Sequence, residues 1–337
     1  MALIAFDARD AFVPMPHGSG VYVARLLAAL QRGGVGGHEL WPVRGGGPGP
    51  EVLFEQLTLP RLLRRRGAAL LHAPDSFLPL RRSCPAVLTV HDLGFESVRG
   101  DMPLRTGLKY RALVRAGARS AERVICPSRF TAGDVMARYR VPEDRIRVIP
   151  EAPALPVGEL APPDGPYVLA AGDLRPKKNL PVLIGAYRSL RRRGLPHRLV
   201  LAGADLGLAE SLRLLAGGEP VELPGFVSDA QLDALIRGAA ALVLPSVYEG
   251  FGLIALEAMA RGCPTLLARA GALPETGGEA ARYFDPGSAE ELTELLASVL
   301  GDSVEQARLR AAGRARAATF SWERAAAETV AVYEELL

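Results

Sequence analysis

Two carboxylates stand eight positions apart in the segment 249–257, which reads Glu-Gly-Phe-Gly-Leu-Ile-Ala-Leu-Glu. The segment follows the apolar run 240–245, so the pattern predicts a buried strand that leads through a Gly-Phe-Gly turn into a helix. The first N–H groups of a helix have no partner inside the helix and bind anions such as phosphate, whereas carboxylates accept hydrogen bonds from sugar hydroxyls. Glu249 and Glu257 at such a turn therefore fit a nucleotide-sugar. A helix cap and a solvated helix acid would give the same pattern.

Basic residues follow another predicted strand, in the segment 171–180, which reads Ala-Gly-Asp-Leu-Arg-Pro-Lys-Lys-Asn-Leu. Gly172 closes the strand, and Arg175, Lys177 and Lys178 come after it. Cationic side chains at the end of a strand suit a diphosphate. A charged loop before a helix is the simpler alternative.

A histidine ends a predicted strand of the first half at residues 87–91. His91 at this position can donate a hydrogen bond to a sugar hydroxyl or orient an acceptor. A core histidine with satisfied hydrogen bonds, followed by Asp92 as a turn cap, explains the same residues. His72 also ends a strand and is a second candidate for the same cleft.

Two glycines, Gly18 and Gly20, precede the first long predicted helix and would let a ligand approach its amino end. A plain turn explains them as well, and the dinucleotide-binding pattern fails because Val23 stands in place of its third glycine. The sequence contains no Asp-x-Asp, no Walker loop, no zinc-ligand spacing and no serine nucleophile elbow. We therefore expect no metal site.

The elements that must position these motifs alternate short apolar runs with longer amphipathic runs, as in α/β proteins. The predicted strands are 3–6, 39–42, 70–72, 87–91, 123–126, 145–149, 167–171, 198–202, 240–244 and 265–268. The predicted helices are 20–31, 104–118, 130–139, 178–193, 206–215, 229–238, 252–261, 288–300, 303–318 and one from 321 to the end. In open α/β sheets ligands bind beyond the carboxyl ends of the strands, where all four motifs fall.

The chain has 337 residues, more than one core usually organises, so two domains are expected. The segment 151–166 contains five prolines and two glycines and is the predicted linker, because this composition stops helices and strands. We expect domains at residues 1–160 and 161–320, and a last helix at 321–337.

Charge is spread unevenly along the chain. Residues 1–160 carry 22 Lys and Arg against 15 Asp and Glu, and residues 161–337 carry 18 against 22. The basic first half fits an anionic acceptor or membrane headgroups, although a solvated arginine-rich face is the simpler explanation. The pattern lacks the features of nucleic-acid-binding modules. The three scattered cysteines, the absence of a membrane-spanning run and the lack of a signal-peptide pattern favour a cytoplasmic protein.

The run 244–264, with Leu273-Pro-Glu275 and Phe284-Asp-Pro286, resembles the retaining GT-B glycosyltransferases that carry a Glu-x7-Glu signature. These enzymes, similar to glycosyltransferase family 4, include sucrose-phosphate synthase and many bacterial mannosyltransferases. The resemblance covers nearly the whole chain. It implies two Rossmann-like domains whose parallel sheets face each other across a cleft, and a C-terminal helix that crosses back to the first domain.

The resemblance also implies roles for the residues of the second domain. Glu249 would contact the hydroxyls of the donor sugar, and Glu257 those of the ribose. Lys178 would bind the donor phosphates, aided by Arg175 or Lys177, because Asp173 stands where many members have arginine. The backbone of the turn would contact sugar or phosphate through Gly250, Phe251, Gly252 and Leu253, and Gly172 belongs to the phosphate turn.

In the first domain, the resemblance places His91 against the donor sugar and directs the loop of Gly18 and Gly20 toward the phosphates or the acceptor. His91, Lys178 and Glu249 are the predicted catalytic set. Negative charge on the departing diphosphate would be stabilised by cations and a helix amino end.

The function implied by the resemblance is transfer of a hexose from a nucleoside-diphosphate sugar to a hydroxyl acceptor, with retention of configuration and without a cofactor. Mannose from GDP-mannose is favoured over UDP-sugars by the likeness to mannosyltransferases. The expected acceptor is a polysaccharide, a glycolipid or a glycoside, with peripheral contact to an anionic membrane. A nucleotide-sugar epimerase and a non-catalytic nucleotide-sugar-binding subunit are the alternatives.

Overall fold

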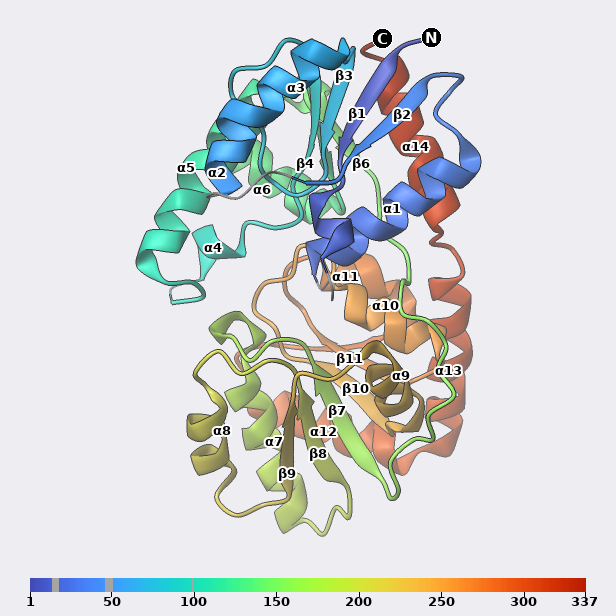
Figure 1. Cartoon of the computed structure of the whole chain (residues 1–337). Helices are drawn as coiled ribbons and strands as arrows, with labels where there is room; N and C mark the ends of the chain where they lie inside the picture. Colours follow the sequence, from blue (N-terminus) through green and yellow to red (C-terminus); the bar gives the residue numbers. More distant parts are fainter. Residues whose placement is uncertain (14–17, 46–50, 99) are drawn as a thin grey trace. The chain divides into compact units, whose positions relative to one another are not determined.

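The computed structural model describes residues 1–13, 18–45, 51–98 and 100–337, which form two compact units (Figure 1). Unit 1 comprises Met1–Glu96, Met102–Ala154 and Ser321–Leu337, and unit 2 comprises Ser97–Asp101 and Leu155–Phe320. The sequence-based boundaries stand at residues 160 and 320, whereas the chain enters unit 2 at Leu155 and leaves it after Phe320. No helix of the described part of the chain is long and apolar enough to cross a membrane.

Unit 1 contains a parallel sheet whose described strands run in the order β2-β1-β3-β4-β5-β6. Its strands are β1 (Leu3–Asp7), β2 (Glu39–Val43), β3 (Leu70–Ala73), β4 (Ala86–Thr89), β5 (Arg123–Cys126) and β6 (Ile146–Val148). Its α-helices are α1 (Ser19–Gly33), α2 (Glu51–Leu53), α3 (Leu59–Arg66), α4 (Gly94–Ser97), α5 (Leu104–Ser120), α6 (Arg129–Tyr139) and α14 (Trp322–Glu334). Shorter helical turns are η1 (Arg9–Phe12), η2 (Phe54–Thr58) and η3 (Glu143–Arg145).

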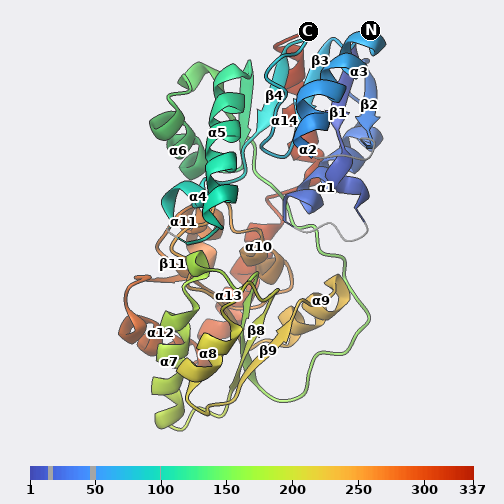
Figure 2. The same cartoon turned by 60° about the vertical axis from the view of Figure 1, so that its left-hand side comes forward.

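The C-terminal helix belongs to unit 1, as expected of this fold. Helix α14 packs beside α1 (Figures 1 and 2). The Ser321 hydroxyl caps its start by accepting a hydrogen bond from the Arg324 N–H. Trp322 Nε1 donates to the carbonyl of Pro153 at 3.0 Å, and buried Tyr333 lies 2.7 Å from His72 Nδ1. These contacts fix both ends of the helix on the first unit.

Unit 2 contains a second six-stranded parallel sheet, in the order β12-β11-β10-β7-β8-β9. Its strands are β7 (Tyr167–Ala171), β8 (Arg198–Ala202), β9 (Val221–Gly225), β10 (Ala241–Leu244), β11 (Thr265–Ala268) and β12 (Arg282–Phe284). Its α-helices are α7 (Leu180–Arg192), α8 (Ala209–Ala216), α9 (Asp229–Gly238), α10 (Leu253–Ala260), α11 (Leu273–Gly277), α12 (Ala289–Gly301) and α13 (Ser303–Ala317). Its shorter turns are η4 (Pro176–Lys178) and η5 (Gly278–Ala280).

The core of unit 2 explains why these segments pair as they do. Strands β7 and β10 consist of buried apolar residues throughout, as expected for central strands of a parallel sheet covered on both faces. Helices α7 and α12 pack together, and α10 packs on α13 (Figure 2). The order of strands reverses between β7 and β10, because β8 and β9 continue to one side and β11 and β12 to the other. Ligands of open α/β sheets bind beyond the carboxyl ends of strands at such a reversal.

Candidate functional site

Two of the predicted motifs lie at the point where the strand order of unit 2 reverses. Strand β7 ends at Ala171 and leads into Gly172, and its neighbour β10 ends at Leu244 and leads into Ser246. Gly172, Lys178 and Ser246 line one hollow of the surface there. The sheet topology therefore brings together residues that are more than 70 positions apart in the sequence.

Lys178 and Glu249 form an ion pair in this hollow. Lys178 Nζ lies 2.7 Å from Glu249 Oε1, and the Ser246 hydroxyl donates to the same oxygen at 2.7 Å. The side chains of the pair are only 15% and 10% exposed. Burial raises the pKa of Glu249, but the charges of Lys178 and Lys177 and the two hydrogen bonds outweigh it, so the pKa lies below its usual range. Glu249 is thus an ionised acceptor at neutral pH.

Glycine is required beside the lysine. The backbone of Gly172 has φ +127°, and a Cβ there would lie 3.1 Å from both Cε and Nζ of Lys178. A Cβ on Gly203, which follows β8, would lie 1.9 Å from the carbonyl oxygen of Gly172. The two glycines let the chain turn tightly at the ends of β7 and β8 and leave room for the ammonium group.

The other two cations of this turn lie beside acids. Arg175 Nε is 3.5 Å from Asp173 Oδ2, and its Nη1 is 3.8 Å from Asp101 Oδ2. The backbone N–H of Lys177 donates to Asp101 Oδ1 at 3.4 Å, and the positive charge of Lys177 reaches Glu249. Two aspartates therefore hold Arg175, whereas Lys177 adds to the positive potential around the carboxylate of Glu249.

The Gly-Phe-Gly turn is fixed from the side of α11. The carbonyl of Glu249 accepts from the Ala272 N–H at 2.9 Å, and the Thr276 hydroxyl donates to the carbonyl of Phe251. Gly252 has φ +90° and precedes α10, and a Cβ there would lie 2.7 Å from Leu273 Cδ2. The turn thus places the amino end of α10, which begins at Leu253, close to the end of β10.

Glu257 lies within helix α10 and belongs to a different polar cluster. Its side chain is 5% exposed; Oε2 is 2.8 Å from Arg261 Nη1, and Oε1 accepts from the Leu155 N–H at 2.7 Å. The structure therefore groups Lys178 with Glu249 and groups Glu257 with Arg261. A contact of Glu257 with a ribose remains a prediction.

The candidate residues of the first half lie in unit 1. His91 Nε2 is 2.8 Å from the carbonyl of Pro74, and Nδ1 is 3.2 Å from Glu151 Oε1. Burial lowers the pKa of His91, but the hydrogen bond and charge of Glu151 raise it to about 9. Both ring nitrogens consequently donate within unit 1, and a contact of His91 with a sugar remains a prediction. The ring also packs edge-on against Tyr22, at 4.6 Å between centroids.

The glycine loop and the second histidine have different surroundings. Gly18 has φ +57° and precedes α1, whereas Gly20 is buried within that helix. A Cβ on Gly18 would meet no atom within 4 Å. His72 is fully buried, with Nε2 2.9 Å from the Thr89 hydroxyl. Burial lowers the pKa of His72 to about 3, so this side chain is a neutral core residue.

Sequence reasoning missed three polar partners. Arg261 follows Glu257 by four positions, the spacing at which helical side chains meet, so this pair was open to prediction. Ser246 precedes Glu249 by three positions in the turn after β10, which gives a weaker signal. Glu151 is 60 positions from His91, and only the fold brings the two together.

Comparison with known proteins shows the family to which the chain belongs. The family model described as "Glycosyl transferases group 1" matches residues 153–316, and that of "Glycosyltransferase Family 4" matches residues 21–152. The chain is 30% identical over 284 residues to the O-antigen chain mannosyltransferase B of Escherichia coli, covering 79% of this chain and 74% of that protein. The chain belongs to the group 1 glycosyltransferases.

Three further matches, one relative and two solved structures, place this glycosyltransferase among proteins of known name and fold. It is 35% identical over 231 residues to the MMP alpha-(1->4)-mannosyltransferase of Mycolicibacterium hassiacum, covering 65% of this chain and only 56% of that relative. The solved sucrose-phosphate synthase of Thermosynechococcus elongatus matches with a TM-score of 0.76 at 22% identity, covering 100% and 99% of the two chains. Anabaena HepE, solved with UDP and glucose, matches with a TM-score of 0.73 at 18% identity over the whole of both chains. These structures confirm the predicted GT-B fold.

Proposed function

We propose that this glycosyltransferase transfers a hexose from a nucleoside-diphosphate sugar to a hydroxyl acceptor. The observation that carries the proposal is the Lys178–Glu249 pair, placed with the amino end of α10 where the strand order reverses. An ammonium group and unpaired helix N–H groups suit a diphosphate, and an ionised carboxylate suits sugar hydroxyls.

In the proposed reaction, the bond between the sugar anomeric carbon and the diphosphate oxygen breaks, and negative charge develops on the diphosphate. Lys178 and the amino end of α10 stabilise that charge, with Lys177 as the second cation. Glu249 holds sugar hydroxyls and Glu257 holds those of the ribose. The acceptor hydroxyl attacks on the face that the diphosphate leaves and passes its proton to the departing phosphate oxygen, so configuration is retained.

We further propose a mannosyl donor, with GDP-mannose ahead of UDP-sugars. Support comes from the two relatives above, both of which are named mannosyltransferases. Their names also favour acceptors that are themselves carbohydrates, as in polysaccharide or glycoside synthesis. Contact with an anionic membrane through the basic first half is tested by sedimentation with anionic vesicles, where a protein that stays in the supernatant contradicts it.

The central experiment is a thermal-shift panel of GDP-, UDP- and ADP-sugars, followed by mass spectrometry of products with candidate acceptors. A nucleotide that raises Tm and a product heavier by one hexose are expected, and the anomeric proton coupling of that product tests retention. An epimerase would convert the donor without an acceptor, and a binding subunit would show stabilisation without product. Absence of stabilisation by any nucleotide would overturn the proposal.

A further inference from the structure

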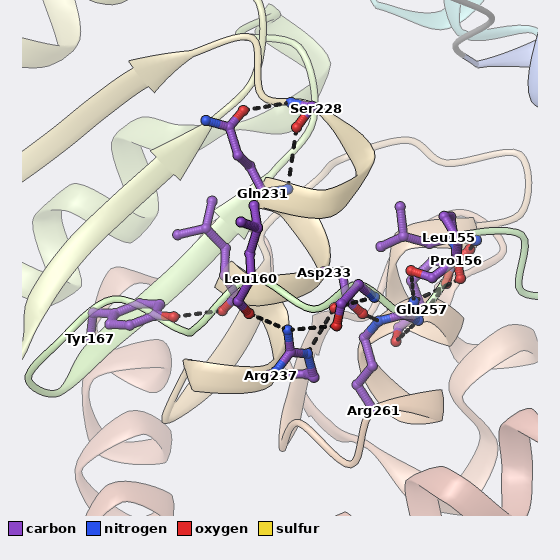
Figure 3. Close-up of polar contacts among 12 residues, drawn as sticks. Leu155, Pro156, Leu160, Tyr167, Ser228, Gln231, Asp233, Arg237, Glu257 and Arg261 are labelled. Atoms are coloured by element: carbon purple, nitrogen blue, oxygen red, sulfur yellow. Dashed lines mark hydrogen bonds and ion pairs between the residues drawn. The ribbon is translucent and has the colours of Figure 1, made fainter.

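The surroundings of Glu257 form a closed network of charges inside unit 2. Its core is Asp233 from α9, Glu257 from α10, and Arg261, the residue directly after α10 (Figure 3). Their side chains are 0%, 5% and 6% exposed, respectively. The network also holds the start of the chain segment that leads from unit 1 into unit 2, at Leu155 and Pro156.

Arg261 uses its whole guanidinium in this network. Nε donates to Asp233 Oδ1 at 2.6 Å, Nη1 to Glu257 Oε2 at 2.8 Å, and Nη2 to the carbonyl of Leu155 at 2.7 Å. Because the guanidinium is planar and its donors point in fixed directions, acceptors on three sides fix its orientation. Burial raises the pKa of Asp233, but hydrogen bonds from Arg237 and Arg261 outweigh it and keep the pKa below its usual range. Asp233 is thus a permanent anion that anchors Arg261.

From this geometry we infer that Arg261, anchored by Asp233, is the positioning residue for Glu257 in donor binding. The inference rests on the proposed function, in which Glu257 holds the ribose. A buried carboxylate on a helix can occupy several rotamers, and Arg261 selects one by binding Oε2. At 2.8 Å the positive charge of Arg261 also compensates the charge of the Glu257 carboxylate, the form that accepts hydrogen bonds from hydroxyls. Arg261 itself does not touch the donor.

The same network contains a matched control in Arg237. Arg237 Nε is 2.8 Å from Asp233 Oδ2, and its Nη2 donates to the carbonyls of Gly158 and Leu160 at 3.2 and 2.6 Å. Both arginines therefore pair with the same aspartate and bind linker carbonyls. The hydrogen bond to Glu257, however, comes from Arg261 (Figure 3). A substitution of Arg237 disturbs Asp233 and the linker without removing that bond.

The experiment measures how well each variant distinguishes a nucleotide with ribose hydroxyls from one without them. Dissociation constants of GDP and 2′,3′-dideoxy-GDP, and in parallel of the two corresponding uridine nucleotides, are determined for wild type, Arg261→Gln, Arg237→Gln and Glu257→Gln. Wild type is expected to prefer the hydroxylated nucleotide about 10- to 100-fold, the range for a hydrogen bond to a charged group. Arg261→Gln and Glu257→Gln should lose most of this preference, whereas Arg237→Gln should keep it. The double variant Arg261→Gln/Glu257→Gln should lose no more than either single variant.

The possible outcomes separate the proposed function, the ribose role of Glu257 and the positioning role of Arg261. A wild type that binds neither nucleotide overturns the proposed function together with this inference. A wild type that binds both equally overturns the ribose role of Glu257 and the inference, but leaves hexose transfer standing. A preference that survives in Arg261→Gln, or disappears equally in Arg237→Gln, overturns the inference alone. If Arg261→Gln does not fold, Arg261→Lys takes its place, because lysine keeps the charge but loses the fixed fork; it should lose a smaller part of the preference.

Discussion

Substitution of Lys178 by methionine should destabilise unit 2 as well as slow transfer, because Glu249 would keep its charge in a largely buried place. The side chain of Glu249 is only 10% exposed, and Lys178 Nζ at 2.7 Å is its nearest cation. Removing one partner of a buried ion pair costs about 3–5 kcal/mol. We expect the lower end, about 3 kcal/mol, because the charge of Lys177 remains. For a unit of this size that corresponds to a fall in Tm of about 6–12 °C.

The double variant Lys178→Met/Glu249→Gln separates this stability effect from the reaction. It leaves no uncompensated charge, so it should recover most of the lost stability. Glu249→Gln alone should cost less than Lys178→Met, because the flexible lysine stem can turn its ammonium toward water. Transfer should remain about 10²–10³-fold slower in both variants that lack Lys178, since both have lost one of the cations that stabilise the departing diphosphate.

Thermal melts by circular dichroism at pH 7 and pH 5, together with transfer rates, test this reasoning. In wild type the lowered pKa of Glu249 contributes stability that is present above the unfolded-state pKa and lost as pH falls through the folded-state pKa. In Lys178→Met, burial is no longer outweighed, so the pKa of Glu249 should rise and the variant should regain stability as pH falls. The Tm difference from wild type should therefore shrink at pH 5. A double variant no more stable than Lys178→Met would refute the coupling, and wild-type transfer by Lys178→Met would refute the donor role.

Three further substitutions, one of them with a matched control, test other features. Glu151 raises the pKa of His91 to about 9 despite burial. The protonated histidine therefore stabilises the fold fully below about pH 6.5, and this stabilisation is lost as pH rises through 9. In melts at a series of pH values, His91→Gln should show a smaller fall of Tm between pH 6.5 and 9 than wild type. Burial and a neighbouring aspartate raise the pKa of Asp10 to about 7; Asp10→Asn should therefore have a higher Tm than wild type at pH 8, and an equal or lower Tm would contradict this burial. Gly252 has φ +90° and no space for a Cβ, so Gly252→Ala should lower Tm in melts and weaken nucleotide binding in titrations. Gly207 has φ +97° but lies in open space, so the control Gly207→Ala should cost only the backbone strain of about 1–2 kcal/mol and leave nucleotide binding unchanged.

Much of the fold was open to prediction because its central strands are short, wholly apolar runs between turn residues. Strands β7 and β8 and helix α9 occupy the predicted ranges. The predicted helix 206–215 is present as α8, but it begins later than predicted, at Ala209, because Asp205 Oδ1 accepts hydrogen bonds from the Gly207 and Leu208 N–H groups. An aspartate that binds the following backbone N–H groups in this way forms a turn in place of a first helical turn.

Other elements could not be predicted from local patterns. Strand β9 is an edge strand that contains Pro224 and Gly225, two residues that weaken a strand pattern, and it pairs with β8. Strand β12 has three residues, too few for a period to show. The helical segment of α2, η2 and α3 was not among the predicted helices.

In the site, the contacts that could not be predicted are those between polar residues far apart in the sequence. The pattern Glu-x7-Glu places both acids on one turn and helix, and it says nothing about the cation beside each one. Lys178 reaches Glu249 only because β7 and β10 are neighbours in the sheet, although they are not consecutive in the chain. Asp233 reaches Arg261 because α9 packs near α10. Such pairings depend on the topology of the fold, so a local sequence pattern does not reveal them.

The partners of the two acids argue against an acid–base pair. Glu249 is bound to Lys178 and Glu257 to Arg261, so each carboxylate has its own cation at hydrogen-bond distance. A general acid needs a raised pKa to hold a proton at neutral pH, whereas the pKa of Glu249 is lowered. Paired with cations, the carboxylates are suited to accept hydrogen bonds from hydroxyls. Positioning of the donor and electrostatic stabilisation of the leaving diphosphate are therefore the contributions that this site is built to make.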